Sequence, residues 1–133
     1  MWLAAVLLPS LAFDVPGRVA VAIAFAVAGA VVALAGVAAF RRASTTVNPI
    51  RPEAVSSLVT SGVYRITRNP MYLGFLLALI GWAVWLAHPL SLLVVPLFVI
   101  YMNRFQIVPE ERVLRARFET AFDSYSGGTR RWL

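Results

Sequence analysis

The residues from 20 to 40 contain no charged side chain and consist of apolar residues and glycine. A helix rises about 1.5 Å per residue, so about 20 such residues cross the roughly 30 Å hydrocarbon core of a bilayer. Arg41 and Arg42 follow this run directly. The whole chain is 60% hydrophobic and 14% charged, whereas soluble domains have roughly 25% charged residues. The sequence therefore predicts an integral membrane protein.

Further apolar runs extend this prediction. A second span is expected from residue 70 to about residue 87, and a third from residue 90 to about residue 102, with a turn at His88-Pro89 between them. The run from 1 to 13 is also apolar but short, and we interpret it as a retained helix because it lacks the basic start and cleavage site of a signal peptide. The fold class expected is an all-α integral membrane protein with about four transmembrane helices.

The pattern changes after Pro109. Glu110 and Glu111 open a segment that mixes apolar and charged residues with helical spacing, which predicts an amphipathic helix on the membrane surface that ends near Tyr125. We expect a single domain over residues 1–133. Its parts are an N-terminal helical hairpin (1–40), a cytoplasmic loop (41–69), a second helical hairpin (70–108) and an interfacial helix (109–126).

The arginines set the orientation of these spans. All twelve basic residues are arginine, and five lie within residues 41–69 and five within residues 112–131. Cytoplasmic loops of membrane proteins are enriched in basic residues. The sequence thus predicts a multi-pass protein whose two basic segments, and both termini, lie on the cytoplasmic side.

Composition also excludes several kinds of site. The chain has no cysteine, which excludes disulfides and thiolate chemistry, and a single histidine, His88, which cannot form a histidine-based metal site alone. No metal site is expected. The net charge of +6 is not arranged as a basic stripe with interleaved aromatics, so we expect the lipid bilayer, and not nucleic acid, as partner.

Two polar clusters are candidates for chemistry. Asn69-Pro70 has the pattern of an N-cap and first turn, and a helix N-terminus binds carboxylates and phosphates. Gly74 would allow close approach of a ligand or of another backbone. A helical hairpin would bring residues 64–74 and 104–111 to the same membrane face. The alternative is purely structural, with the tyrosines and arginines as headgroup anchors and the acids as helix caps.

Three motifs carry a resemblance to a known family. Leu58-Val59-Thr60-Ser61-Gly62-Val63-Tyr64, Arg68-Asn69-Pro70-Met71-Tyr72-Leu73-Gly74 and Glu110-Glu111 resemble the isoprenylcysteine carboxyl methyltransferases, and the related phospholipid N-methyltransferases share the C-terminal pattern. The resemblance covers residues 45–125. It implies a membrane-embedded methyltransferase that uses S-adenosyl-L-methionine and a lipophilic or membrane-associated acceptor, either a carboxylate or an amine.

The resemblance also implies which residues bind the cofactor and the substrate. The cofactor would contact Ser57, Leu58, Val59, Tyr64, Asn69, Pro70, Met71, Tyr72, Gly74, Glu110 and Glu111. Glu110 and Arg104 are the candidate catalytic residues, and Arg104 and Gln106 the candidate substrate-binding ones. The sequence departs from the family where Asn69 replaces a common histidine, where Glu119 replaces a common glycine, and where Gln106 replaces the arginine assigned to the carboxylate substrate.

Two other functions remain open at this point. One is phospholipid N-methylation, since an amine acceptor needs no arginine at position 106. The other is a small four-helix transporter or a structural membrane subunit. Transporters often place an acidic residue within a span, and the predicted spans here contain none.

Overall fold

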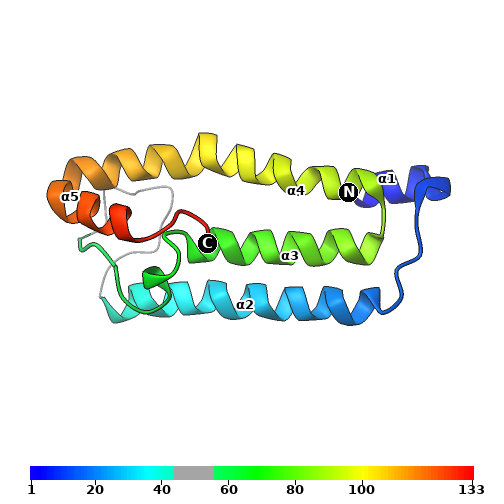
Figure 1. Cartoon of the computed structure of the whole chain (residues 1–133), viewed down its shortest axis with the longest axis horizontal. Helices are drawn as coiled ribbons and strands as arrows, with labels where there is room; N and C mark the ends of the chain where they lie inside the picture. Colours follow the sequence, from blue (N-terminus) through cyan, green and yellow to red (C-terminus); the bar gives the residue numbers. More distant parts are fainter. Residues whose placement is uncertain (44–55) are drawn as a thin grey trace.

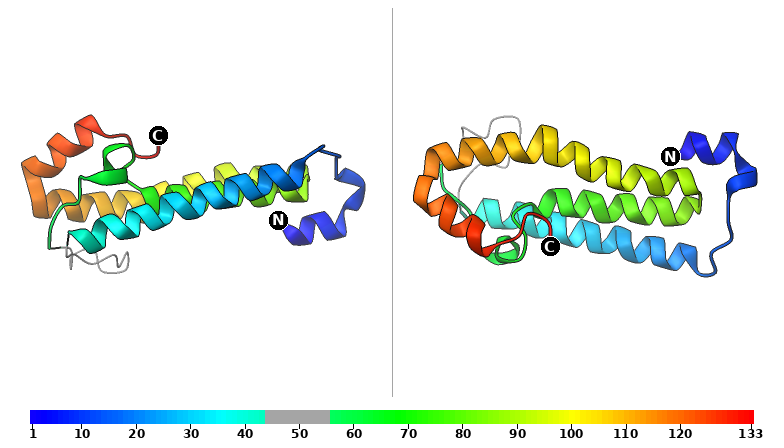
Figure 2. Two further views of the ribbon diagram at one scale, coloured as in Figure 1. Left: turned by 90° about the horizontal axis from the view of Figure 1, so that it is seen from below. Right: turned by 45° about the horizontal axis from the view of Figure 1, so that its top comes forward.

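The computed structural model describes residues 1–43 and 56–133, so part of the predicted loop (residues 44–55) lies outside the described residues. Three long helices run side by side in one layer (Figures 1 and 2). In Figure 2 the last part of α5 and the η3 segment lie on one side of this layer. The elements are α1 (Trp2–Leu7), η1 (Pro9–Leu11), α2 (Arg18–Arg42), η3 (Gly62–Arg65), α3 (Pro70–Leu86), α4 (Pro89–Tyr101), the π-helix η4 (Met102–Ile107) and α5 (Val108–Gly128).

The three strongest predicted spans are confirmed as helices. Two helical segments are long and apolar enough to cross a membrane: α2, with 25 residues, and Pro89–Gly128, with 40 residues and a kink at Glu119. The apolar α3 is shorter, with 17 residues. Large apolar side chains such as Val31, Leu34 and Leu97 are exposed along these helices. Lipid is the solvent in which such an exposed apolar surface is stable.

The fourth predicted span is not confirmed. Helix α1 has six residues, and at about 1.5 Å per residue it is far too short to cross a bilayer. The segment after it packs on the turn between α3 and α4, where His88 Nε2 donates to the Leu8 oxygen (3.1 Å) and Phe13 N donates to the Ala87 oxygen (3.0 Å). The C-terminal residues instead contact Asn69, at the other end of α3. The N-terminal segment and the C-terminal residues thus contact opposite ends of α3, and the placement of both termini on the cytoplasmic side stays a prediction.

Glycines allow α2 and α3 to pack with their backbones in contact. A methyl group at Gly74 would lie 2.6 Å from the Gly29 oxygen and 2.7 Å from the Ala33 Cβ, and one at Gly81 would lie 2.8 Å from the Ala22 oxygen. Small residues at such positions let membrane helices approach closely, which increases their van der Waals contact. Gly74 thus serves helix packing, and it is not among the residues that line the pocket described below.

Helix α4 continues through η4 into α5 without a break. We expected the hairpin to end near residue 108 and an interfacial helix to begin at Pro109; α5 begins at Val108, and it continues from η4. Proline lacks the N–H that an α-helix needs, and its ring clashes with the carbonyl four residues earlier. The π-helical turn at Met102–Ile107 directly precedes Pro109. Its wider turn gives the ring room, so the helix continues.

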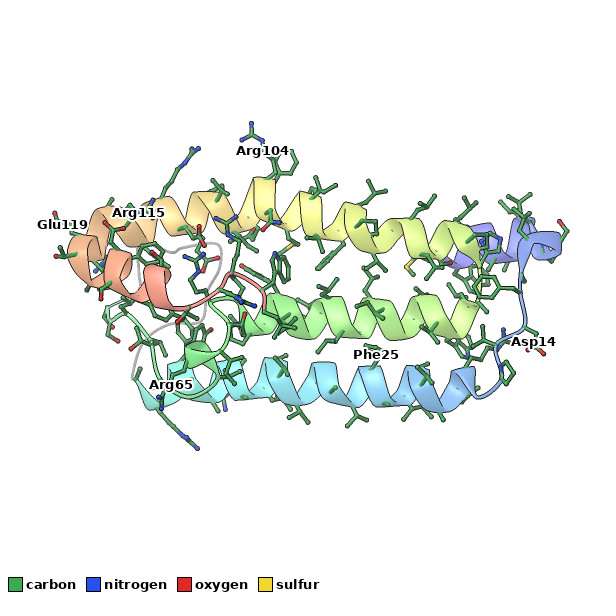
Figure 3. The ribbon with its side chains drawn as sticks, in the orientation of Figure 1. Asp14, Phe25, Arg65, Arg104, Arg115 and Glu119 are labelled. Carbon is green, nitrogen blue, oxygen red and sulfur yellow. The ribbon has the colours of Figure 1, made fainter. Side chains whose placement is uncertain are left out.

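Glu119 turns the end of α5 back over the bundle. Its backbone has φ 41° and ψ −117°, inside a segment that is otherwise helical. The part of α5 after Glu119 therefore changes direction, and the C-terminal residues return towards the start of α3 (Figures 1 and 3). The single amphipathic helix predicted up to Tyr125 is thus two helical pieces joined at Glu119. The resemblance described above implies glycine at this position.

The strain at Glu119 leads to a prediction about stability. A positive φ costs a residue other than glycine about 1–3 kcal/mol. Glycine adopts positive φ without this cost, so Glu119→Gly should stabilise the folded protein. We expect its melting temperature in detergent to rise. Thr120→Gly is the matched control, because Thr120 is helical and exposed and glycine there should lower stability by about 1 kcal/mol. A lower melting temperature for Glu119→Gly than for the wild type would show that the Glu119 backbone is not strained.

Candidate active site

A pocket lies at the end of the bundle where α5 turns back. It is open at its mouth, and the space in it that no atom fills amounts to about 650 Å³, a volume that includes open solvent. Its lining comes from the end of α2, the segment before α3, the start of α3, and both pieces of α5. The residues are Phe40, Ser57, Leu58, Val59, Tyr64, Arg68, Asn69, Met71, Tyr72, Ile107, Glu110, Glu111, Leu114, Phe122 and Tyr125.

The first wall of the pocket is formed by residues 57–72 and is anchored to α2 through Tyr64. The Tyr64 ring is buried and meets the Phe40 ring edge-to-face, with centroids 5.3 Å apart. Burial raises the pKa of the Tyr64 phenol well above its ordinary value, and the negative charge of Glu110 raises it further. Tyr64 is therefore a neutral phenol at physiological pH. It contributes an aromatic surface and not a negative charge.

The second wall is formed by Ile107 and α5, and it contains the carboxylate of Glu110. The Tyr72 hydroxyl donates to Glu110 Oε2 across the pocket (3.1 Å), and Tyr72 also makes a side-chain hydrogen bond with Gln106. This chain of contacts orients Glu110. A carboxylate has about four lone-pair sites, so Glu110 retains capacity to accept further hydrogen bonds from a ligand.

Beside Glu110, two arginines surround Glu111. Arg131 binds it with two hydrogen bonds, from Nε at 3.1 Å and from Nη2 at 2.6 Å, and Arg68 Nη2 lies 3.5 Å from its Oε1. The hydrogen bonds to Glu111 raise the pKa of Arg131, so Arg131 stays charged. The cluster carries a net charge of +1 from two arginines and one glutamate. Arg68 Nε is buried and has no hydrogen-bond partner among the described residues.

Nine of the eleven predicted cofactor residues line the pocket: Ser57, Leu58, Val59, Tyr64, Asn69, Met71, Tyr72, Glu110 and Glu111. The other two, Pro70 and Gly74, pack against Gly36 and Gly29 of α2. Asn69 precedes α3, but its side chain does not cap the helix as predicted; Asn69 Nδ2 donates to the Arg131 oxygen (2.9 Å).

The two predicted substrate residues differ in their placement. Arg104 is exposed and points away from the bundle (Figure 3). The structure therefore does not bring Arg104 to the pocket, either as a catalytic or as a substrate-binding group. Gln106 does not line the pocket, but it contacts Tyr72, which does. The residue that supplies positive charge to the pocket is Arg68.

Six pocket residues were not predicted: Phe40, Arg68, Ile107, Leu114, Phe122 and Tyr125. Arg68 begins the motif Arg68–Gly74 and directly precedes Asn69, so the sequence did contain a signal that Arg68 lies at the site. Phe122 and Tyr125 reach the pocket only because the chain turns at Glu119, and the Tyr125 hydroxyl then donates to the Tyr64 oxygen (2.7 Å). Their apolar spacing suits an amphipathic helix equally well, so periodicity could not distinguish the two placements.

The arrangement suits a ligand that combines a cation, a carboxylate and a flat ring. Aromatic rings attract cations over their faces, and four aromatic residues line the described pocket besides Phe40: Tyr64, Tyr72, Phe122 and Tyr125. Arg68 offers donors for a carboxylate, and Glu110 accepts from an ammonium or a hydroxyl.

Comparisons with known proteins find similarity to methyltransferases. The model of the phospholipid methyltransferase family matches residues 17–121. A probable protein-S-isoprenylcysteine O-methyltransferase of Oryza sativa subsp. indica is 34% identical over 80% of this chain and 56% of its own length. Protein-S-isoprenylcysteine O-methyltransferase B of Arabidopsis thaliana is 36% identical over 64% of this chain and 43% of its own length.

A third relative is an uncharacterized protein of Haemophilus influenzae, 41% identical over 47% of this chain and all of its own length. The chain spans about half the length of the two plant methyltransferases named above. No solved structure matches.

Proposed function

Because the chain belongs to the phospholipid methyltransferase family, we propose that it is an S-adenosyl-L-methionine-dependent methyltransferase acting on a lipophilic or membrane-associated acceptor. The observation that supports this most is the pocket itself. It joins Glu110, Arg68 and several aromatic rings around one open pocket. This pocket lies at the end of apolar helices, where an acceptor held in a bilayer can reach it.

The residues present fit the cofactor. In this proposal Arg68 and the N-terminus of α3 bind the methionyl carboxylate, since both carry positive charge. Glu110, held by Tyr72, accepts hydrogen bonds from the ribose hydroxyls or the ammonium. The aromatic rings of Tyr64 and Tyr72 lie against the cationic part. When bound, the cofactor supplies a methyl group already activated by a sulfonium.

The protein's part in catalysis is then mainly positioning. Two reactants held in line in a site shielded from water react much faster than in solution. The apolar lining residues Leu58, Val59 and Ile107 exclude water from this space. A carboxylate acceptor needs no general base, and an amine acceptor needs only to arrive deprotonated. The lack of a histidine or cysteine in the described pocket is compatible with both.

An amine acceptor is the second candidate, as in phospholipid N-methylation. Gln106 stands where a carboxylate-binding arginine would be expected, and Arg104 points away from the pocket. Transfer of labelled methyl groups to ethanolamine lipids, with none to isoprenylcysteine carboxylates, would support this acceptor. The reverse preference would support the carboxylate. We further propose that the pocket faces the cytoplasm, since described arginines of both arginine-rich segments, such as Arg65 and Arg115, lie at this end (Figure 3).

The proposed function predicts that the wild-type protein binds S-adenosylhomocysteine. Isothermal titration of the detergent-purified full chain should give a Kd below about 1 mM, the upper range of typical KM values. The ligand should also raise the melting temperature, because binding to the folded state stabilises it. ATP, which shares the adenosine but lacks the methionyl group, should give a much smaller shift. No heat and no stabilisation at millimolar S-adenosylhomocysteine would refute the proposal.

A further inference from the structure

Residues 129–132, which we name the C-terminal strap, cross from one wall of the pocket to the other. On the first wall, Arg68 N donates to the Arg130 oxygen (2.9 Å), and Asn69 Nδ2 and Thr67 Oγ1 donate to the Arg131 oxygen (2.9 and 3.3 Å). Thr67 and Arg130 also form an isolated parallel bridge. The main chain of the strap is therefore fixed to the segment that precedes α3.

The side chains of the strap contact the opposite wall. Arg131 binds Glu111 of α5 through both Nε and Nη2, and Trp132 Nε1 donates to Asn103 Oδ1 in η4 (3.1 Å). One short segment thus binds the first wall through its backbone and the second through its side chains. Other polar contacts between the walls join Tyr72 to Glu110 and to Gln106, Tyr125 to Tyr64, and Arg68 to Glu111.

Arg131 is the residue in which the two attachments meet. Its carbonyl oxygen accepts from the first wall, and its guanidinium donates to the second. Its bidentate geometry fixes both distance and direction, which a single point charge does not. Glu111 is 15% exposed in its side chain, so it would be costly to leave without its partner.

Resting on the function proposed above, we infer that Arg131 is a positioning residue of the cofactor site, which sets the spacing of the two walls through its bond to Glu111. It does not line the described pocket and acts through Glu111. With Glu111 held by Arg131, Arg68 keeps its buried Nε free for an anionic group of the ligand. Loss of Arg131 would leave Arg68 as the only described arginine bound to Glu111, and would draw Arg68 away from the ligand.

The matched variants are Arg131→Ala and Arg130→Ala. Both remove one arginine from adjacent positions in the strap, but the Arg130 side chain is exposed and its contacts to the first wall are made by its backbone. We expect Arg131→Ala to weaken S-adenosylhomocysteine binding about 10- to 100-fold, the range for hydrogen bonds to charged groups. Arg130→Ala should bind as the wild type does. In turnover, Arg131→Ala should raise the KM for the methyl donor and leave kcat at saturating donor nearly unchanged.

A double-mutant cycle tests whether Arg131 acts through Glu111. In a Glu111→Ala background, Arg131→Ala should weaken binding by less than about twofold further, because the contact is already lost. An undiminished effect in that background would overturn the inference.

Wall spacing can be measured without any ligand. The chain has no cysteine, so spin labels attach only at introduced Ser61→Cys and Ala116→Cys, one on each wall and both exposed. Arg131→Ala should broaden the distance distribution between the labels, and Arg130→Ala should not. Identical distributions and affinities in the two variants would overturn the inference. If the wild type fails to bind S-adenosylhomocysteine, the proposed function is refuted, while the label distances still decide whether Arg131 sets the wall spacing.

Discussion

An alanine at position 74 is expected to force α2 and α3 apart and to destabilise the folded protein by about 3 kcal/mol, the upper end of the typical cost of overpacking. The added methyl group would lie 2.6 Å from the main-chain oxygen of Gly29 and 2.7 Å from the Cβ of Ala33. Neither atom belongs to a flexible side chain that can rotate away. The helices must therefore separate, and the close contact along the whole pair weakens.

The control for this variant has the opposite sign. Alanine at Gly127, which has no neighbouring atom within 4 Å of the added methyl, should stabilise its helical turn by up to about 1 kcal/mol. Thermal melting in detergent, followed by tryptophan fluorescence or by size-exclusion chromatography after heating, measures both. Equal melting temperatures for Gly74→Ala and the wild type would show that α2 and α3 are not packed as described.

Replacement of Glu110 by glutamine should weaken ligand binding strongly. Glutamine keeps the shape of the side chain and can still accept from Tyr72, but it removes the negative charge that faces the pocket. A hydrogen bond to a charged group contributes about 1.5–3 kcal/mol, so S-adenosylhomocysteine affinity should fall about 10- to 100-fold. Isothermal titration measures this, and the methyl-transfer rate at low donor should fall in parallel.

Glu119→Gln is the control for charge. It changes an exposed acid in the same helix and should leave the affinity unchanged. If Glu110→Gln and Glu119→Gln bound the ligand equally, Glu110 would not contact the cofactor, and the assignment of the second wall would be wrong.

The sequence predicted the helices of the bundle well, because an uncharged run closed by arginines or by a His-Pro turn has few alternatives in lipid. The spans expected at residues 20–40, 70–87 and 90–102 correspond to α2, α3 and α4. The span expected over residues 1–13 is not confirmed, because hydropathy does not report how long a helix is. Pro9 begins a 3-10 turn there, and the chain is held at the α3–α4 turn by His88.

The pocket was only partly predictable, and the missing part has a physical reason. Residues such as Tyr64, Tyr72 and Glu110 lie in quoted motifs and were expected together. Phe122, Tyr125 and Arg131 reach the site through a backbone turn at Glu119, a residue type that gives no local signal for positive φ. Long-range contacts of this kind, between residues about 60 apart in sequence, leave no periodic pattern.

The π-helical turn at Met102–Ile107 affects how the faces of α4 and α5 are oriented relative to each other. Each residue of an α-helix rotates the next by about 100°, so the extra residue of a π turn offsets the angular phase of everything that follows. The faces of α4 are set by its surroundings in the bundle, and those of α5 by the pocket. Because of this offset, α4 can face its neighbours in the bundle while α5, which continues from it, faces the pocket. The length of this turn, more than its side chains, determines that Glu110 and Glu111 are oriented inward.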